Sequence, residues 1–463
     1  IDNGGDCEDS EPNIHPGQEE ICADGWDNDC DGQANGCGLD PFTRLSEAKS
    51  IYLGENAKDY AGAKLAFGSL LPEAESAVVV LSSEADFDLE NTGRVDVYPI
   101  LEGNILPTDA VARIWGEEVS TLGSSLRADV DINQDQYQDI LVGASDATTQ
   151  GVSGTGAVFL FWGVLSGDIT VSDSDAQLWG ASSNDRFGAS AQPYVQNETV
   201  EIWVGAPNYD LPFYNGGSVF IFEVKDGAQS IADTLYQIDA VESTQAFGSV
   251  MAEPFDGNGD GVDDCAIAAP GANASNGAVY IFQEMVNSSR STAEADVEIQ
   301  GEIANGSFGT QVEYLGDITG DGYAELAIGS PDTDQVFLFQ TVEKGSYSPE
   351  DAVVELIGPE DSNTGYSLER VGDVNGDGAD DLVIGANIAS QVYVLYGPLN
   401  GSYSLEQSAV ILEDSQADQV GSSIQSMGDY NQDGANDVLI GAQISSLQAY
   451  KSGAVFQLEG LGL

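Results

Sequence analysis

The sequence predicts an all-β protein, a seven-bladed β-propeller of four-stranded blades. One unit recurs seven times, with anchoring glycines 56 to 65 residues apart at Gly62, Gly123, Gly188, Gly248, Gly309, Gly365 and Gly421. Each unit holds four short apolar runs that are rich in β-branched and aromatic residues, as β-strands are. A period near sixty residues with four strands per repeat is typical of a propeller.

The strands of one unit can be followed along the chain. In the second unit, an apolar run (DILVGAS) begins at Asp139 and is followed by a glycine-containing turn and the alternating run GAVFLF from Gly156. A further run, AQLWG from Ala176, precedes the next anchor, Gly188. We therefore expect the propeller to span residues 47–463, after a linker at 39–46 and a separate N-terminal segment at 1–38.

Five of the seven units carry an acidic loop of the form DxNxDxxxD, which begins eight residues after the anchor. Positions 1, 3, 5, 7 and 9 of these loops are Asp131, Asn133, Asp135, Tyr137 and Asp139; Asp256, Asn258, Asp260, Val262 and Asp264; Asp317, Thr319, Asp321, Tyr323 and Glu325; Asp373, Asn375, Asp377, Ala379 and Asp381; and Asp429, Asn431, Asp433, Ala435 and Asp437. The first and third units lack the loop.

The loops predict calcium sites. Positions 1, 3 and 5 offer side-chain oxygens, position 7 offers its backbone carbonyl, and position 9 offers a carboxylate that can bind through both oxygens. Carboxylates about 5 Å apart repel by roughly 3 kcal/mol per pair at an effective dielectric near 20, or on the order of 10 kcal/mol per loop. No Lys or Arg lies within a loop. Oxygen ligands in an irregular arrangement favour Ca²⁺ over Mg²⁺.

Two alternatives to a propeller calcium loop fit the pattern less well. An EF-hand needs twelve loop residues, a closing Glu and helical flanks, whereas here the ninth residue closes the loop and the flanks are strands. A set of solvated acidic turns would not recur five times at one offset from a glycine. The Thr319 and Glu325 substitutions predict a weaker third site.

The motifs together resemble the FG-GAP repeat, of which integrin α-subunits carry seven. The Phe-Gly pair occurs at Phe187, Phe247 and Phe308, and a Gly-Ala-Pro-like triplet begins at Gly205, Ala268 and Gly329. The resemblance implies that each calcium loop joins the first and second strands of a blade, on the face opposite the ligand site. It also implies that SIYLG, from Ser50, pairs with the C-terminal strand around residues 454–458 and closes the ring.

Composition restricts the partners. The chain has 78 acidic against 13 basic residues and a net charge of −65, which repels nucleic-acid phosphates and anionic lipid headgroups. No apolar run reaches the roughly 18 residues of a transmembrane helix. Five calcium ions would leave most of the charge in place, so the remaining acidity suggests a saline environment, where salt screens self-repulsion.

The N-terminal segment is rich in cysteine and aspartate. Cys7, Cys22, Cys30 and Cys37 lie in a stretch too short to form a hydrophobic core, so we expect disulfides, of unassigned connectivity, rather than a zinc site. The string from Asp6 to Gly32 resembles the MopE-like metal-binding motif of secreted bacterial proteins. That resemblance suggests one or more further calcium sites, with ligands among Asp27, Asn28, Asp29 and Asp31.

The residues argue against an enzyme. The only histidine, His15, lies outside the repeats, so no Ser-His-Asp triad or histidine-rich metal centre can form in the propeller. Disulfides place the chain outside the cytosol, as a secreted, extracellular or cell-surface protein. The resemblance to the MopE-like motif implies a bacterial origin. Because residue 1 is Ile, we expect a signal peptide to have preceded it.

The function expected is that of a secreted, calcium-stabilised propeller in cell-surface adhesion, protein–protein interaction or extracellular assembly. The turn PNYDLPFYNGG carries Tyr209, Asp210, Phe213 and Tyr214, and could bind a cell-surface protein or glycan or simply pack against a neighbouring blade. The alternatives are a lectin-like propeller, which should repeat an aromatic-polar set in several blades, and a structural subunit of a surface filament. The oligomeric state is left open.

Overall fold

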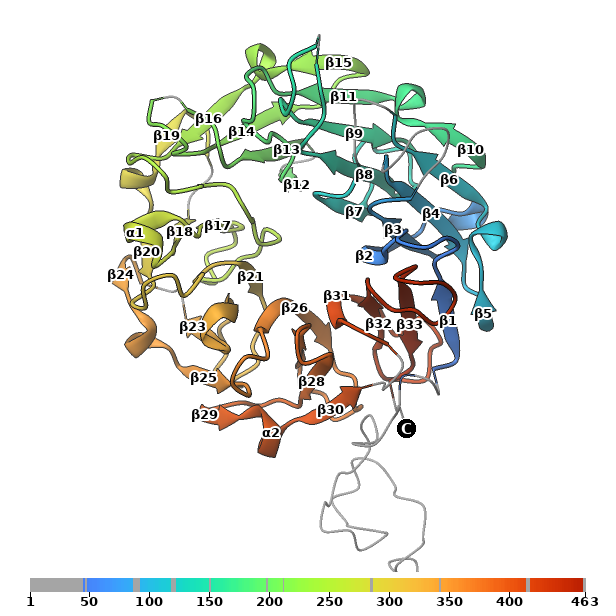
Figure 1. Ribbon diagram of the computed structural model, residues 1–463. Coiled ribbons are helices and arrows are strands. Elements are labelled where there is room, and N and C mark those ends of the chain that lie inside the picture. The colour runs from blue at the N-terminus through green and yellow to red at the C-terminus, as the bar shows by residue number, and fades with distance from the viewer. Residues whose placement is uncertain are drawn as a thin grey trace, which may run out of the picture.

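The computed structural model describes residues 45, 48–85, 92–117, 122–149, 151–196, 199–210, 212–283, 286–340, 343–413 and 417–460. Seven β-sheets stand around a central axis, and the chain passes from one sheet to the next in order (Figure 1). The predicted all-β, seven-bladed propeller is confirmed. The N-terminal segment 1–38, with the cysteines and the Asp27–Asp31 ligands predicted there, lies outside the described residues.

Each blade runs from an inner strand beside the axis to an outer strand at the rim. Blades 1 to 3 are formed by β2 (Ala61–Gly68), β3 (Ala77–Ser82), β4 (Arg94–Pro99) and β6 (Ala112–Trp115); by β7 (Leu126–Val130), β8 (Asp139–Ala144), β9 (Ala157–Phe161) and β11 (Ala176–Trp179); and by β12 (Ser190–Gln196), β13 (Thr199–Ala206), β14 (Ser218–Glu223) and β16 (Tyr236–Asp239). The strands within each blade are antiparallel.

The remaining four blades follow the same plan. Blades 4 and 5 contain β17 (Cys265–Ala269), β18 (Ala278–Phe282) and β20 (Val297–Gln300), and β21 (Gln311–Tyr314), β22 (Glu325–Ser330), β23 (Gln335–Gln340) and β25 (Val354–Ile357). Blades 6 and 7 contain β26 (Thr364–Gly372), β27 (Asp381–Ala386), β28 (Gln391–Leu395) and β30 (Val410–Glu413), and β31 (Val420–Gly428), β32 (Asp437–Ala442), β33 (Ala454–Leu458) and β1 (Ser50–Leu53). In blade 4 the inner edge is held only by isolated bridges, Met251 to Ile267 and Phe255 to Asp264.

The ring closes between the two ends of the propeller. β1 pairs with β33 in antiparallel register, from Ser50 opposite Gln457 to Leu53 opposite Ala454, and so forms the outer strand of blade 7. This is the closure that the sequence resemblance implied. Because no unpaired edge separates the first and last blades, the ring is continuous.

A fifth strand at the rim was not predicted. In six blades the segment between the third and fourth strands adds a short strand that pairs in parallel with the outer strand of the preceding blade. These strands are β5 (Gly103–Ile105), β10 (Gly167–Thr170), β15 (Gly227–Ser230), β19 (Arg290–Ser291), β24 (Gly345–Tyr347) and β29 (Gly401–Ser404). Neighbouring blades are thus joined by hydrogen bonds as well as by packing.

The helical elements are single turns. The α-helical turns are α1 (Ala272–Ser275) and α2 (Leu405–Ser408), and the 3₁₀ turns are η2 (Pro72–Ala74), η3 (Pro107–Asp109), η4 (Val171–Asp173), η5 (Ile231–Asp233), η6 (Thr292–Glu294), η7 (Pro331–Thr333) and η8 (Pro349–Asp351). Several follow a rim strand and begin with a capping box, as where Asp173 accepts from the Thr170 amide at 2.8 Å. No described helix is long and apolar enough to cross a membrane.

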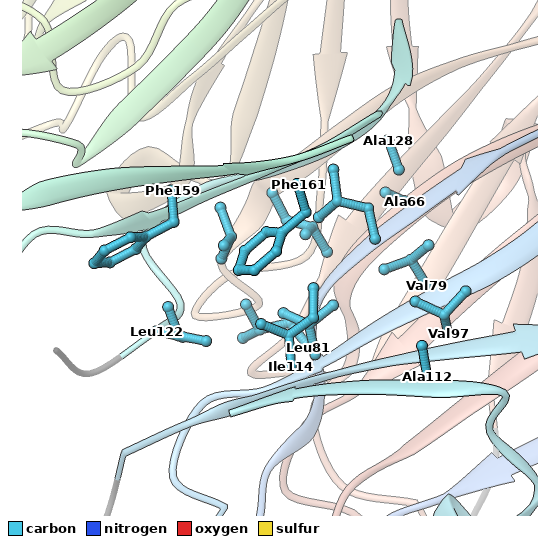
Figure 2. Close-up of a cluster of buried hydrophobic side chains, with 14 of the residues drawn as sticks. Ala66, Val79, Leu81, Val97, Ala112, Ile114, Leu122, Ala128, Phe159 and Phe161 are labelled. Atoms are coloured by element: carbon cyan, nitrogen blue, oxygen red, sulfur yellow. The ribbon is translucent and has the colours of Figure 1, made fainter. Parts of the chain in front are cut away.

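The hydrophobic core lies between adjacent blades. Between blades 1 and 2, Val79 and Val97 belong to the same buried cluster as Phe159 and Phe161, all at most 1 % exposed (Figure 2). The anchoring glycines lie where the inner strands begin. At Gly188 φ is +86°, and a Cβ would lie 2.4 Å from the carbonyl oxygen of Ala157. Glycine is therefore required there by both the backbone conformation and the close approach of the neighbouring blade.

Candidate metal centres

All five acidic loops occupy the same place in their blades. They join the first and second strands of blades 2, 4, 5, 6 and 7. In blade 4 the loop ends at Asp264, one residue before the second strand begins at Cys265. In the other four blades the last loop residue is also the first residue of the second strand: Asp139, Glu325, Asp381 and Asp437. Inner strands run in the same sense around the ring, so the loops lie together at one end of the propeller. The structure therefore confirms the predicted position of the loops between the first and second strands.

The loop backbone turns through left-handed conformations at positions 4 and 6. The residues there are Gln134 and Gln136 (φ +63° and +81°), Gly259 and Gly261 (+77° and +86°), Gly320 and Gly322 (+78° and +96°), Gly376 and Gly378 (+76° and +89°), and Gln432 and Gly434 (+61° and +98°). Glycine adopts this conformation without steric cost, whereas other residues pay roughly 1–2 kcal/mol. Blade 2 carries that cost at both positions, and blade 7 at one.

One hydrogen-bond pattern repeats in every loop. In blade 2 the Asp131 carboxylate accepts from the backbone amides of Asp135 at 3.0 Å and Gln136 at 2.8 Å, and Asp135 accepts from the Tyr137 amide at 2.9 Å. The same bonds recur at the corresponding positions in blades 4, 5, 6 and 7. The carboxylates are thereby drawn into the concave side of the loop, and the tyrosine, valine and alanine side chains at position 7 take no part.

The carboxyl group at position 9 is the buried end of each loop. Asp139, Asp264, Glu325, Asp381 and Asp437 are all at most 1 % exposed. In blade 2, Asp139 accepts from the loop amide of Ile132 at 2.7 Å and from the Gly163 amide, beyond the third strand, at 2.7 Å. Gly397 and Gly460 make the equivalent bonds in blades 6 and 7 at 2.9 Å. This carboxylate therefore ties the loop to the far end of strand three.

Burial shifts the pKa of these position-9 carboxyl groups upward. Loss of solvent raises the pKa of Asp139 to about 6 and that of Asp264, Glu325, Asp381 and Asp437 to about 7. The other carboxylates of the same loop act in the same direction, while the backbone amides oppose the shift. A nearby positive charge would lower these pKa values and favour the ionised form.

Within the part of the chain that the structure describes, no lysine or arginine supplies such a charge to the ligand positions. None of the ion pairs among the described residues includes a side chain at positions 1, 3, 5 or 9 of a loop. One oxygen of the fully buried Asp437 has no hydrogen-bond partner. Among the described residues, no three His, Cys, Asp or Glu side chains already form a cage. The hard oxygen donors and the unpartnered buried oxygen nevertheless fit a divalent cation.

The blade 5 loop differs at two ligand positions. The Thr319 hydroxyl donates to Glu325 at 3.1 Å, and the longer Glu325 side chain also accepts from the Thr319 amide at 3.3 Å. The loop thus keeps its shape, with the Thr319 hydroxyl turned inward as a donor. It lacks the asparagine side-chain oxygen that the other four loops have at position 3. This geometry is compatible with the weaker site expected from the sequence.

Comparison with known proteins supports the assignment of the repeat. The family model of the FG-GAP repeat matches residues 365–395, from the first to the third strand of blade 6. The chain carries FG-GAP repeat sequence. A second family model, a metal-binding motif named Cu-binding_MopE, matches residues 6–35, as the sequence resemblance suggested. That name refers to copper, whereas the oxygen-rich ligands led us to expect calcium in that segment.

The FG-GAP propeller is also similar in sequence to integrin α-chains. Integrin alpha-PS5 of Drosophila melanogaster is 34 % identical over 39 % of this chain and 18 % of its own length. Integrin alpha-PS3 of the same species is 30 % identical over 47 % and 20 %, and Homo sapiens integrin alpha-IIb is 27 % identical over 51 % and 23 %. The chain thus spans about a fifth of the length of the curated relatives it matches.

The predicted ligand turn of the FG-GAP propeller lies at the end opposite the acidic loops, between the second and third strands of blade 3. Its four residues are not equivalent. Tyr209 packs edge-on against Phe220, with ring centroids 5.1 Å apart. Asp210 accepts from the Asn215 amide at 2.9 Å and shapes the turn. Phe213 and Tyr214 are 38 % and 65 % exposed. Tyr209 is therefore part of the blade packing, and only Phe213 and Tyr214 present apolar surface.

The central channel holds charged residues that the sequence reasoning missed. Arg127 donates to Asp129 at 3.0 Å and to Glu253 at 2.7 Å, and Glu313 and Glu369 line the same channel. Burial raises the pKa of Glu369 to about 8 and that of Glu313 well above its usual range. Three of these residues stand four positions after an anchoring glycine, a spacing that could have revealed them.

Proposed function

We propose that the protein is a calcium-stabilised propeller that binds a protein partner outside the cell, in adhesion or in the assembly of a cell-surface structure. The observation that carries the calcium part is the fivefold recurrence of one loop geometry around a buried carboxyl group that lacks a counter-charge among the described residues. Calcium would supply that charge. Each ion would be held by oxygens at positions 1, 3 and 5, the carbonyl of position 7 and the carboxylate of position 9.

Calcium suits these loops better than magnesium. Ca²⁺ takes six to eight oxygen ligands in flexible geometry, whereas Mg²⁺ requires a near-ideal octahedron and retains several waters. A nine-residue loop with a carboxylate at its closing position offers the larger and less regular oxygen set. In our proposal the ion neutralises the loop and holds the first two strands of the blade together. It takes no part in recognition.

The test of the calcium part is thermal unfolding of the full chain in calcium, in magnesium and in EGTA. If the five sites fill, the stabilisation grows by about 2.7 kcal/mol per site at a hundredfold excess over the dissociation constant. We expect the melting temperature to fall on the order of 10 °C or more on chelation. Restoring calcium should recover it, and magnesium at the same concentration should recover much less. A melting curve unmoved by EGTA would refute the calcium assignment.

The proposed protein partner rests on the similarity to integrin α-chains and on the character of the face opposite the loops. Connections on that face expose large apolar side chains, namely Val152, Phe213, Tyr214, Ile303, Ile388 and Tyr450. Exposed apolar groups beside polar ones are typical of protein-binding surfaces. The chain has no histidine within its repeats with which to build common hydrolytic centres, so we propose a binding protein rather than an enzyme.

A glycan array read in calcium and in EGTA distinguishes protein recognition from a lectin. We expect no calcium-dependent signal on the array. Saturable binding to one defined sugar would replace our proposal with the lectin alternative. Labelling of intact cells of the source with an antibody to the propeller, before and after external protease treatment, tests the location. Signal that survives protease would contradict an extracellular position.

A further inference from the structure

A cavity opens between blades 4 and 5 at the end of the propeller opposite the acidic loops. Its volume is about 260 Å³, and it is lined by parts of the connection from blade 4 to blade 5, the η7 turn and the third and fourth strands of blade 5. Small-molecule pockets typically begin near 300 Å³, so this cavity is suited to a single side chain. It is separate from the blade 3 turn.

The floor and one wall of the cavity are apolar. Phe308 and Phe337 form the floor, with ring centroids 6.0 Å apart, and they are only 2 % and 6 % exposed. Ile303 stands at the wall and is 55 % exposed. An isoleucine so exposed beside a cavity loses contact with water when a partner side chain enters.

Three carboxylates belong to the lining of the cavity. They are those of Glu302, Glu350 and Glu355. Glu355 is held in place, because one of its oxygens accepts from Gln335 Nε2 at 2.9 Å and the other from Ser402 Oγ at 3.1 Å. Each carboxylate oxygen can accept a second bond, so Glu355 retains acceptor capacity toward the cavity. No ion pair among the described residues engages Glu302 or Glu350.

Blade 3 shows what fits this space, because the chain fills the equivalent position itself. The third strands align so that Phe220 of blade 3 corresponds to Phe337 of blade 5, each two residues after the strand begins. The second strands end in Gly205-Ala206 and Gly329-Ser330, and a proline follows each, so Tyr209 corresponds to Thr333. In blade 3 the Tyr209 ring packs edge-on at 88° against Phe220. In blade 5 the small Thr333 leaves that space open.

The polar partner of the tyrosine also has a counterpart. In blade 3, Phe220 is paired with Gln237 across the sheet, and the Tyr209 hydroxyl lies next to the Gln237 side chain. In blade 5, Phe337 is paired with Glu355 in the same register. A tyrosine hydroxyl placed as in blade 3 would donate to a carboxylate, and such a bond is stronger than one to an amide.

We propose that this cavity is a docking site for a tyrosine side chain in a basic segment of a protein partner. The ring lies on Phe308 and Phe337 beside Ile303, and the hydroxyl donates to Glu355. Lysine or arginine residues next to that tyrosine face Glu302 and Glu350. The docking site rests on the proposed function and deepens it by naming the chemistry of the partner.

Two alternative sources of the tyrosine are disfavoured. Residues 1–44 of this chain contain no tyrosine. A second copy could offer the exposed Tyr214, Tyr323 or Tyr450, but two chains of net charge −65 repel each other. The acidic lining of the cavity and the acidic chain therefore both point to a basic partner.

The test is titration of the full chain, in saturating calcium, with acetylated and amidated Lys-Tyr-Lys, followed by NMR of isoleucine methyl groups or by calorimetry. Lys-Phe-Lys, Lys-Ala-Lys and Glu-Tyr-Glu are the comparison peptides. We expect saturable binding of Lys-Tyr-Lys that perturbs the Ile303 methyl resonance. Loss of the hydroxyl or of the basic flanks should each weaken binding several-fold, and loss of the ring at least tenfold. Equal binding of Lys-Ala-Lys would overturn the proposal.

Variants of the chain locate the site. Thr333→Tyr should fill the cavity as blade 3 does and abolish binding, whereas Thr333→Val should preserve it. Glu355→Gln should remove the preference for tyrosine over phenylalanine. Glu360→Gln, an exposed acid in the next connection, is the charge-matched control and should bind as the parent does. Melting temperatures in calcium show whether each variant is folded, and unchanged peptide binding by folded Thr333→Tyr contradicts the assignment.

Two further results distinguish a partner-docking site from a self-association site and from an effect of calcium. Self-association that Thr333→Tyr abolishes, seen by sedimentation, would assign the cavity to a second copy instead of a partner. The peptide titration does not depend on the chelation experiment. A chain insensitive to EGTA that still binds Lys-Tyr-Lys would refute the calcium proposal alone, and a calcium-stabilised chain that ignores the peptide would refute the docking site alone.

Discussion

Blades 3 and 4 differ in how the inner edge of the blade is attached to the second strand. In blade 3 the first two strands pair at seven successive positions, from Ser190 opposite Gly205 to Gln196 opposite Thr199, and no acidic loop is present. Tyr194 and Trp203 pack across that hairpin with ring centroids 5.5 Å apart. In blade 4 the inner edge is held by two isolated bridges, and a DxNxDxxxD loop joins it to the second strand.

The difference indicates what the acidic loops contribute. A hairpin with a full ladder and aromatic cross-strand packing is stable by itself, whereas a short or interrupted inner strand needs another connection to its neighbour. Blades 2 and 5 also pair at few positions in this hairpin, three and four respectively. We infer that calcium replaces backbone pairing most where the ladder is shortest.

The largest expected effect is on hydrogen exchange after chelation. In EGTA, the amides of the first two strands should lose about a hundredfold or more of their protection in blades 2, 4, 5, 6 and 7 together, because all five loops lose their ion and the loop carboxylates then repel. The blade 3 hairpin should keep its protection. Peptide-resolved exchange by mass spectrometry measures both. Uniform loss around the ring would show that the loops stabilise the whole propeller and not their own blades.

Single substitutions at position 9 should cost different amounts of stability in different loop-bearing blades. Asp264→Asn in blade 4 should cost about 3 kcal/mol in calcium, because it weakens ion binding at an edge held by two bridges. Asp381→Asn in blade 6 should cost about half as much, since its hairpin pairs at six positions. Denaturant unfolding in calcium measures both costs. Equal costs would break the link between ladder length and dependence on calcium.

Trp203→Phe in blade 3 provides the matched control for these variants. It removes the Trp203 indole bond to Glu201, 3.3 Å long, without touching an acidic loop. Its cost should be the same in calcium and in EGTA, whereas the cost of Asp264→Asn should shrink greatly in EGTA. The opposite pattern would assign the calcium effect to blade 3 and contradict the comparison.

The stability of the metal-free protein should depend on pH through the same position-9 carboxyl groups. Their pKa values are raised to about 6 or 7, above the roughly 4 of an unfolded chain, so the folded state holds these protons longer. The stability from these groups is complete below pH 4 and is lost as pH rises through 6 to 7. In EGTA the melting temperature should therefore fall by about 5 °C between pH 5.5 and 8.

Calcium should reverse this trend, because the ion binds the ionised form and is displaced by protons below about pH 6. Glu313 and Glu369 in the channel carry pKa shifts of the same sign but lie outside the loops. Replacing both with glutamine should leave the difference between the calcium and EGTA profiles unchanged. If that difference disappeared, the pH response would belong to the channel.

The smallest expected effect is at the divergent loop of blade 5. Thr319→Asp adds a carboxylate at position 3, beside Glu325. We expect calcium affinity at this site to rise by about tenfold or less, because added ligand charge tightens calcium sites. Without calcium the same variant should be less stable than the parent, because the added carboxylate repels the others in the loop. Calcium titration, followed by hydrogen exchange of the blade 5 hairpin, measures both changes. An unaltered calcium affinity would mean that Thr319 is not a ligand.

Much of the fold and of the loops could be predicted from the sequence. The seven anchors, the strand runs and the DxNxDxxxD loops are local patterns, and local patterns determine which segments become strands and turns. The closure through Ser50–Leu53 was implied by the resemblance to the FG-GAP repeat, and the structure confirms it. The calcium ligands of the five loops remain a prediction that the experiments above test.

Other features depended on contacts between segments far apart in the chain. The rim strands, such as Gly103–Ile105, have no strong strand pattern and pair only because a neighbouring blade presents an unpaired edge. Tyr209 and Phe213 lie four residues apart in one turn, yet Tyr209 packs on Phe220 while Phe213 is exposed. No property of the turn alone distinguishes them.

The sequence by itself determined a seven-bladed ring with five acidic loops at one end, because repeat period, strand composition and loop spacing are each encoded within about sixty residues. Only the tertiary structure decided how strongly each blade depends on its loop and where the opposite face is open. The ladder lengths of blades 3 and 4 and the cavity beside Thr333 result from packing between strands and between blades. Such packing depends on shape and burial across long sequence separations, which a local pattern does not record.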